Sequence, residues 1–398
     1  MKSAISLLAL AAGLSAAPYT HDVKKAEEFR HRDGLPNVFA KIQAGQTVRV
    51  AYVGGSITAA NGWRVKTLAW LKKQYPRANF VEINAAISGT GSDYAACRLP
   101  GDVLQHKPDL VFVEFRVNGG GGFERPSIEG VVRQIWQDNP QTDVCFVYTI
   151  GTWMLTNLQA GKMVGFGEIM EAVANRYGIP SIDLGIEVAK QVTAGTLTYK
   201  ANEPEAGKTL FSKDGVHPGG DGHGIYRDVI ARSMLKMQDK AGPLTHELGA
   251  PMYENPWEVA ALLPIGKAKL SAGWTPVNEA KDPVYTDDSR RTKAMLRGAV
   301  KCTQAGETIT VRWNGTTVGI SDIPHTGVMV VEAVVDGKKP ILVERKQREA
   351  RRKYSRFWYL PAQAPGEHEV RFTIRQLPEG LSFYAGQILV IGTPLPAK

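Results

Sequence analysis

Residues 45 to 235 of this 398-residue chain alternate short apolar segments with segments of helical periodicity. The apolar segments predict strands at 47–53, 80–83, 109–115, 144–149 and 179–184. Between and after them, amphipathic spacing predicts helices at 63–75, 127–138, 168–177 and 225–237. The segment 109–115 is apolar almost throughout, as in a strand buried on both faces. The alternation predicts an α/β fold, with a parallel sheet between two layers of helices.

The pattern changes after residue 266. Residues 308–313 alternate polar and apolar side chains, and the Asn314-Gly315 dipeptide that follows is typical of a hairpin turn. Further strands are predicted at 328–335, 368–374 and 387–391, with Asp336-Gly337 as a second turn. Residues 266–398 are therefore predicted to form an all-β domain, most simply a β-sandwich. Residues 241–265, which contain Gly-Pro and Asn-Pro breaks, are predicted to be a linker, so the α/β domain spans 18–240.

The N-terminus has the features of an export signal. Lys2 precedes an apolar stretch from Ala4 to Leu14, and the small residues 15–17 follow. We expect residues 1–17 to be a signal peptide and the mature chain to be periplasmic or extracellular. No later apolar run approaches the ~18 residues that span a bilayer, so no membrane span is expected. The three cysteines cannot all pair with one another, and Cys145, inside an apolar segment, is expected in the core.

The chain is basic, with a formal net charge of +9. Its densest basic run, 345–353, lies between two predicted strands and is expected to be a solvated loop or short helix. A basic balance suits an anionic partner such as a nucleic acid or an acidic glycan. No nucleic-acid-binding motif accompanies the charge, so we expect no nucleic-acid partner.

Two sequence segments carry residues of nucleophilic catalysis. Ser56 follows a predicted strand and Gly54-Gly55, and a helix begins soon after it, so its hydroxyl is expected at the carboxyl end of a parallel sheet. Asp214 and His217 are three residues apart near the end of the α/β region. A serine hydroxyl needs a base, and that base needs an acceptor on its other ring nitrogen. Each segment alone is weak, because a metal-ligand pair or a capped turn would look the same.

Two further residues are expected on the same rim. Gly89 and Asn118 each follow a predicted strand, and the carboxyl ends of parallel strands meet at one edge. The backbone N–H groups of Ser56 and Gly89 and the amide of Asn118 could together bind a developing oxyanion.

In this order, Ser56, Gly89, Asn118 and His217 resemble the four marks of the SGNH hydrolases, also called GDSL esterases. The resemblance covers residues 45 to 235. It implies a flavodoxin-like three-layer fold, ester hydrolysis without a metal or cofactor, and Asp214 as the third member of a catalytic triad. Two positions depart from the family pattern. Gly55 stands where Asp is frequent, at a position without a chemical role, and Gly119 stands where Asp usually follows the Asn.

Arg116, close to Asn118, admits two interpretations. It could form an internal salt bridge with Glu114 or Asp93, or it could hold an anionic or hydroxyl-rich substrate. Four other side chains near the predicted rim are candidate substrate contacts, with core packing or salt bridging as the alternative for each: Trp63, Arg64, Arg98 and Trp153.

Asp221 and His223 invite a metal interpretation together with Asp214 and His217. Their spacings fit no metal-binding signature, so we expect no metal and assign Asp221 to His223 to the turn that enters a helix.

The predicted substrate is an acylated glycan. Export places it outside the cytoplasm, and a β domain after an esterase resembles the accessory modules of carbohydrate-active enzymes, an analogy at the level of the fold. No long apolar lid is visible. We predict removal of acetyl or similar groups from a polysaccharide. The alternatives are a lipolytic acylhydrolase or thioesterase, a glycoside hydrolase that pairs Glu114 with Asp214, and a non-catalytic glycan-binding protein. The β domain could bind glycan or have a structural role.

Overall fold

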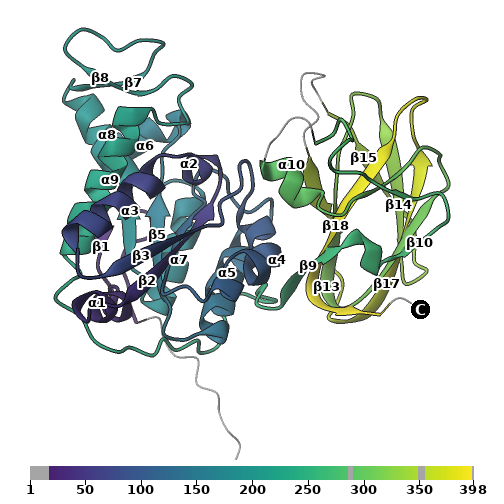
Figure 1. Ribbon diagram of the computed structural model, residues 1–398, viewed down its shortest axis with the longest axis horizontal. Coiled ribbons are helices and arrows are strands. Elements are labelled where there is room, and N and C mark those ends of the chain that lie inside the picture. The colour runs from purple at the N-terminus through teal and green to yellow at the C-terminus, as the bar shows by residue number, and fades with distance from the viewer. Residues whose placement is uncertain (1–17, 286–289, 348–354, 397–398) are drawn as a thin grey trace, which may run out of the picture.

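A computed structural model describes residues 18–285, 290–347 and 355–396 (Figure 1). The predicted signal peptide lies outside the described residues. In the α/β domain, five strands are parallel: β2 (Thr47–Gly54), β3 (Asn79–Asn84), β4 (Leu110–Glu114), β5 (Asp143–Tyr148) and β6 (Ser181–Asp183). The short β1 (Phe29–Arg30) pairs antiparallel with β6. The sheet order β1-β6-β5-β4-β2-β3 gives the parallel strands flavodoxin-like connectivity, with the switch in strand order beside β2.

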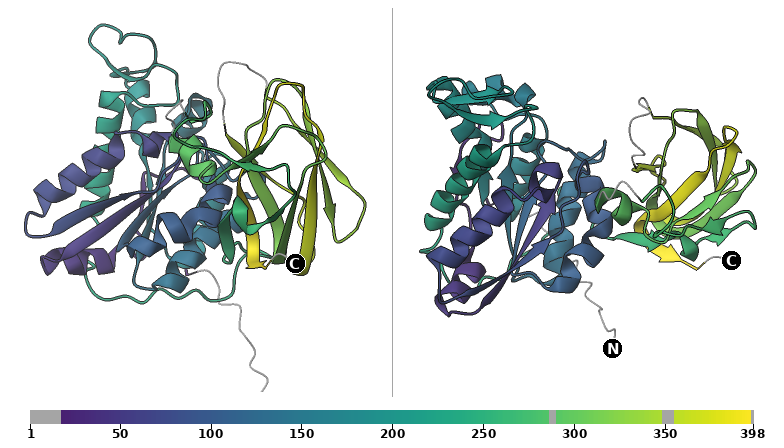
Figure 2. Two further views of the ribbon diagram at one scale, coloured as in Figure 1. Left: turned by 45° about the vertical axis from the view of Figure 1, so that its right-hand side comes forward. Right: turned by 45° about the horizontal axis from the view of Figure 1, so that its top comes forward.

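Helices cover both faces of this sheet, which confirms the predicted three-layer α/β/α fold (Figures 1 and 2). One face is covered by α1 (Pro36–Gln43), α3 (Trp63–Gln74), α8 (Leu184–Thr193) and α9 (Gly220–Leu235). The other is covered by α4 (Ser92–Asp102), α5 (Glu124–Asp138) and α7 (Phe166–Tyr177). The helices α4, which contains Pro100, and α8 lie outside the segments predicted from periodicity.

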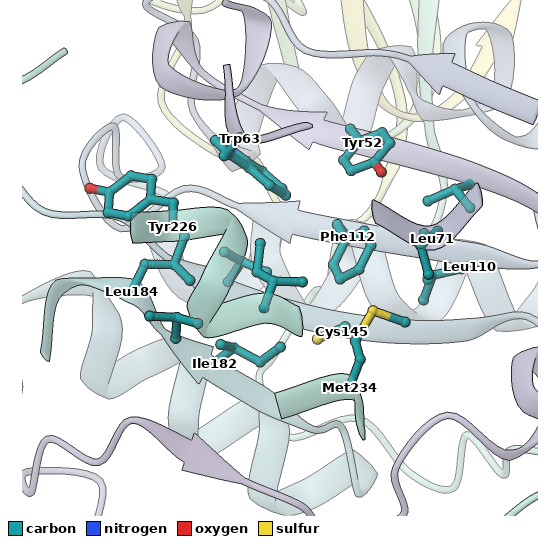
Figure 3. Close-up of a cluster of buried hydrophobic side chains, with 14 of the residues drawn as sticks. Tyr52, Trp63, Leu71, Leu110, Phe112, Cys145, Ile182, Leu184, Tyr226 and Met234 are labelled. Atoms are coloured by element: carbon teal, nitrogen blue, oxygen red, sulfur yellow. The ribbon is translucent and has the colours of Figure 1, made fainter. Parts of the chain in front are cut away.

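The strand β4 shows why its sequence is apolar throughout. Its side chains alternate between the two hydrophobic clusters of the domain, with Leu110 and Phe112 in one and Val111 and Val113 in the other. In the first cluster, drawn in Figure 3, Phe112 stacks on Tyr52 with ring centroids 5.4 Å apart. Cys145 is buried in the same cluster, as predicted, and the three cysteines are buried free thiols.

The C-terminal part is an all-β domain whose described strands pair antiparallel around a third buried cluster. Its longer strands are β13 (Thr308–Asp322), β14 (Met329–Val335), β15 (Ile341–Arg345), β17 (Gly366–Gln376) and β18 (Phe383–Leu395). Shorter strands are β9 (Ala260–Pro264), β10 (Lys269–Leu270), β11 (Thr275–Pro276), β12 (Val300–Cys302) and β16 (Arg356–Tyr359). The Asp336-Gly337 turn between β14 and β15 is confirmed, since both residues have positive φ, 51° and 70°.

The hairpin predicted at Asn314-Gly315 is wrong. The strand β13 runs through both residues, pairing with β17 from Thr308 to Gly315 and with β18 from Arg312 to Asp322. A Cβ atom on Gly315 would lie 2.1 Å from the carbonyl oxygen of Ile391. This glycine therefore permits a close approach of two backbones and makes no turn.

The range predicted as a linker, 241–265, packs against both domains. Trp257 is buried and its carbonyl oxygen accepts a hydrogen bond from Gln134 of α5 at 2.7 Å. The strand β9 at the end of this range pairs with β18 of the β domain.

Two other sequence predictions concern membrane-spanning helices and the basic run. Among the described residues, no helix has both the length and the apolar character required to cross a bilayer. Residues 348–353, which are most of the basic run, lie outside the described residues. Arg345 at its start forms a two-bond ion pair with buried Asp322, at 2.6 and 2.7 Å.

Candidate active site

Ser56 is the first residue of the short helix α2 (Ser56–Ala59), directly after β2. The two preceding glycines are required by close packing. A Cβ on Gly54 would lie 2.9 Å from the carbonyl oxygen of Glu114, and one on Gly55 would lie 1.9 Å from Asn118 Oδ1. Gly55, which the sequence analysis treated as a position without a role, therefore leaves the space that Asn118 occupies.

His217 and Asp214 lie in the loop between β8 (Thr209–Ser212) and α9. His217 Nε2 is 2.8 Å from Ser56 Oγ, and its Nδ1 is 2.7 Å from Asp214 Oδ2. Residues 161 positions apart in the chain thus form one continuous hydrogen-bonded series. This is the geometry in which an imidazole takes the proton of a serine hydroxyl while a carboxylate holds the ring.

Asp214 is held in its loop by its own hydrogen bonds. Its Oδ1 accepts the backbone N–H groups of Val216 and His217, each at 2.8 Å. Partial burial would raise the pKa of Asp214, but the hydrogen bonds from the His217 ring and from these backbone groups outweigh it and hold the pKa well below its usual range. The carboxylate is therefore ionised at any pH at which the protein would work.

Ser212, which the sequence analysis did not single out, organises this loop. Its Oγ lies 2.7 Å from the carbonyl oxygen of His217 and 3.0 Å from Asp214 Oδ1, and it accepts the N–H of Gly215 at 2.9 Å. The sequence feature that could have identified Ser212 is its position at the end of β8, two residues before Asp214.

The site is open to solvent. The side chains of His217 and Asp214 are 50% and 56% exposed. The histidine at the centre of the hydrogen-bonded series is therefore accessible to water and to a group carried on a large molecule.

Gly89 and Asn118 lie on the same rim as Ser56. Gly89, with φ +67°, is in the loop after β3, and this loop is joined to the end of β2 by the hydrogen bond from Ile87 N–H to Gly54 carbonyl at 3.0 Å. Asn118 lies in the turn after β4, and its backbone N–H donates to the carbonyl oxygen of Phe115 at 2.9 Å. Its Oδ1 is buried with no hydrogen-bond partner among the described residues. The positions fit donors to an oxyanion beside Ser56, a role that stays a prediction.

The substrate contact predicted for Arg116 is contradicted. Its side chain is fully buried and forms a two-bond ion pair with Asp183, at 2.5 and 2.7 Å. The alternative of an internal salt bridge is correct, but its partner is neither Glu114 nor Asp93. Asp183 also accepts the N–H of Gly185 as the N-cap of α8. Arg116 thus ties the end of β4 to the start of α8.

Trp63, Arg64 and Arg98 are also buried, so the structure contradicts their predicted contact with substrate. Trp63 packs edge-on against Tyr52 in the core (Figure 3). Arg64 pairs with Glu82, and Arg98 donates to the carbonyl of Ala85 and to Asp102. Sequence periodicity does not distinguish a buried arginine with internal partners from one that faces a cleft.

Trp153 is the one of these candidates that faces solvent, with 60% of its surface exposed. It lies in a short 3₁₀ helix (Thr152–Met154). Thr152 donates two hydrogen bonds to the carbonyl oxygen of Gly215, from its backbone N–H at 2.9 Å and from its hydroxyl at 2.8 Å. Trp153 is therefore next to the loop that carries Asp214 and His217.

Glu114 is unavailable as a catalytic partner of Asp214. It is fully buried and accepts hydrogen bonds from Thr58 at 2.8 Å and Thr149 at 2.7 Å. Burial raises the pKa of Glu114. The carboxylate pair that a glycoside hydrolase would need is not formed by these two residues.

His223 and Asp221, which were considered as metal ligands with Asp214 and His217, differ in their burial. His223 is buried, and its Nδ1 accepts the N–H of Trp63 at 3.1 Å, while burial lowers the pKa of its ring to about 4. Asp221 is exposed in the first turn of α9. The described residues contain no group of three or more potential metal ligands.

Comparisons with known proteins agree with this architecture. Residues 52–225 match the GDSL-like Lipase/Acylhydrolase family. Thioesterase 1/protease 1/lysophospholipase L1 of Escherichia coli strain K12 is 26% identical over 202 residues, which are 50% of this chain and 88% of the relative.

Solved structures match both domains. A two-domain esterase active on acetylated mannans superimposes with a TM-score of 0.73 and 20% identity, over 96% of this chain and 100% of that chain. The structure of such an esterase co-crystallised with mannopentaose gives a TM-score of 0.72 and 21% identity, over 90% of this chain and 94% of that chain. These likenesses confirm the predicted order of an α/β domain followed by an all-β domain.

Proposed function

We propose that the chain is a carboxylic ester hydrolase that removes acetyl groups from a polysaccharide through an acyl-enzyme, because residues 52–225 match the GDSL-like Lipase/Acylhydrolase family. The observation that carries the proposal is the hydrogen-bonded series from Ser56 Oγ through His217 to Asp214. The polymer substrate is supported by the solvent-open site and by the two-domain likeness to esterases active on acetylated mannans.

The proposed reaction has two halves. Ser56 Oγ attacks the acetyl carbonyl carbon while His217 Nε2 takes the hydroxyl proton, and the imidazolium then gives that proton to the leaving sugar hydroxyl. Water, activated by the same nitrogen, then attacks the acetyl-serine and releases acetate. Asp214 stabilises the charged ring in both halves. Ser56 N–H, Gly89 N–H and the Asn118 amide would bind the oxyanion, each donor typically contributing about 3 kcal/mol to lowering the barrier.

The first experiment measures acetate release from acetylated mannan, acetylated xylan and a short aryl acetate. Ser56→Ala should fold normally and release no acetate above background, because no other hydroxyl occupies its place beside His217. A fluorophosphonate probe should label the native protein at Ser56 and leave the variant unlabelled. Turnover by Ser56→Ala equal to that of the native protein would reject the triad.

Trp153 is proposed to stack against a sugar ring, since it is exposed beside the catalytic loop. Trp153→Ala should raise KM for the polymer severalfold while leaving kcat/KM for the aryl acetate within about twofold. An equal loss on both substrates would indicate a structural role for Trp153.

The second candidate is a lipolytic acylhydrolase or thioesterase, favoured by the likeness to the Escherichia coli enzyme. Preference along a series of aryl esters separates the two proposals. A deacetylase should prefer the two-carbon acyl group, whereas increasing kcat/KM up to long acyl chains would favour the lipolytic alternative.

Export remains part of the proposal and rests on the sequence of residues 1–17. Expression of the full chain in a bacterial host followed by fractionation should give a periplasmic or released protein shortened at its N-terminus. A cytoplasmic protein with an intact N-terminus would contradict export.

A further inference from the structure

The β domain reaches the rim of the α/β domain through the helix α10 (Arg290–Met295) (Figures 1 and 2). Arg291, the second residue of this helix, is buried between the two domains with 3% of its surface exposed. Its Nη1 donates to the carbonyl oxygen of Ser88 at 2.7 Å, and its Nε donates to the carbonyl oxygen of Ser355 at 2.9 Å. One guanidinium group thus connects the β domain to the residue directly before Gly89.

We propose that Arg291 is a positioning residue for catalysis, which orients the backbone N–H of Gly89 toward the oxyanion. The inference rests on the proposed function, since it concerns an oxyanion donor of that same site.

The planar peptide bond provides the physical link. The carbonyl of Ser88 and the N–H of Gly89 belong to one rigid trans unit, in which they point in opposite directions. A hydrogen bond that fixes the Ser88 oxygen therefore also fixes the direction of the Gly89 N–H. Because the donor is a charged guanidinium, it also polarises the peptide and makes the N–H at the other end a stronger donor.

The peptide needs such a support. Gly89 has φ +67°, in the region that favours glycine. Because glycine has no Cβ, its backbone is less restricted than that of other residues, and the peptide between Ser88 and Gly89 has little intrinsic preference for one orientation. Within the α/β domain, Ile87 N–H bonds Gly54 and Thr90 Oγ1 bonds the Ile87 carbonyl. Among the described residues, Arg291 is the hydrogen-bond donor to the Ser88 carbonyl.

The β domain is also linked to the second loop of the rim, through the start of α4. Tyr359 of β16 donates to the carbonyl of Asp93 at 3.2 Å, at the start of α4. The neighbouring Ser92 N–H donates to the carbonyl of Gly119 at 3.0 Å, directly after Asn118. Both proposed oxyanion loops are therefore connected by hydrogen bonds to elements that contact the β domain.

The chain offers a matched control at the next residue. Arg290 donates to the carbonyl of Asn84, the last residue of β3. The peptide that follows Asn84 carries the N–H of Ala85, which donates to Tyr52 within the sheet and is not available to substrate. Arg290→Met thus removes an interdomain hydrogen bond of the same kind without affecting a proposed oxyanion donor.

The test uses the full-length protein and a short aryl acetate, so that polymer binding plays no part. Arg291→Met should lower kcat about 10- to 50-fold with KM changed less than twofold, because removing a whole oxyanion donor typically costs about 10²–10³ in kcat. The rate of fluorophosphonate labelling at Ser56 should fall in parallel, since that adduct also places an oxygen in the oxyanion site. Arg291→Lys should recover part of kcat by donating one hydrogen bond to Ser88, and Arg290→Met should keep native kcat.

Thermal melting separates positioning from stability. If Arg291→Met does not fold, Arg291→Lys compared with Arg290→Met still decides the question, because the inference requires a lower kcat only for the former. Folded Arg291 variants with native kcat, or an equal loss in Arg290→Met, would overturn the inference. An active Ser56→Ala variant would instead reject the proposed function, so the two failures are distinguishable.

Discussion

At the scale of single residues, burial decides which of the charged side chains on this rim are available for chemistry. Asp214 is more than half exposed and ionised, whereas Glu114 at the end of β4 and Arg116 just after it are buried. The resemblance of Ser56, Gly89, Asn118 and His217 to the SGNH pattern, with Asp214 three residues before His217, predicted which residues form the hydrogen-bonded series. The roles of Arg116, Arg64 and Arg98 were not predictable, because a buried arginine depends on partners, such as Asp183, that are distant in the chain.

Asp93 provides a pH-dependent prediction at this scale. It is 2% exposed, one of its carboxylate oxygens has no partner among the described residues, and burial raises its pKa to about 6. A carboxyl group whose pKa is higher in the folded state stabilises the fold while protonated. Its contribution is complete below the ordinary pKa near 4, and it is lost as the pH rises through about 6.

The substitution Asp93→Asn removes this ionisation while keeping the shape. Relative to the native protein, the variant should gain up to about 3 kcal/mol of unfolding free energy on going from pH 4 to pH 7.5, following the difference between the two pKa values. Urea unfolding of both proteins at four pH values measures this difference, in which the titration of all other groups cancels. A difference that does not vary with pH would show that Asp93 titrates as it does in the unfolded chain.

At the scale of elements, periodicity located the five parallel strands and the helices α3, α5, α7 and α9, because these strands are almost wholly apolar and these helices bury one apolar face. Local sequence signals were misleading where a residue is explained by its packing in the folded chain and not by its sequence neighbours. Asn314-Gly315 has the composition of a tight turn, yet it lies within β13, where the glycine permits contact with β18. Likewise, α4 contains Pro100, a residue that argues against a helix in sequence, although it lies close to the helix end.

The glycine in β13 gives a prediction for this element. Gly315→Ala should destabilise the protein by about 1–3 kcal/mol, because the added Cβ would collide with the carbonyl oxygen of Ile391, which belongs to the backbone and cannot rotate away. Gly266→Ala in the same domain is the control, since its Cβ would have no heavy atom within 4 Å. Chemical denaturation compares the two variants, and equal stability would mean that the crossing of β13 and β18 is wider than described.

At the scale of the whole molecule, one of the hydrophobic clusters is shared by the two domains. The cluster on the α4 and α5 face includes Met295, Leu389 and Ile391 of the β domain. Tyr94 of α4 stacks on Phe357 of β16, with ring centroids 4.8 Å apart. The sequence predicted each domain from its own periodicity, but the contact between them depends on side chains more than 200 residues apart and leaves no local pattern.

Deletion of residues 266–398 tests how far the α/β domain depends on this contact. The truncated chain would expose Tyr94 and Trp257 and lose the hydrogen bond from Arg291 to the Ser88 carbonyl. We expect poor solubility or a melting temperature lowered by 10 °C or more, on the order expected for loss of several large buried side chains. Any soluble fragment should also hydrolyse a short aryl acetate more slowly than the full chain, which a domain that only binds polymer would not explain. A stable fragment with native aryl acetate turnover and reduced affinity for acetylated mannan would instead show that the β domain is an independent glycan-binding module.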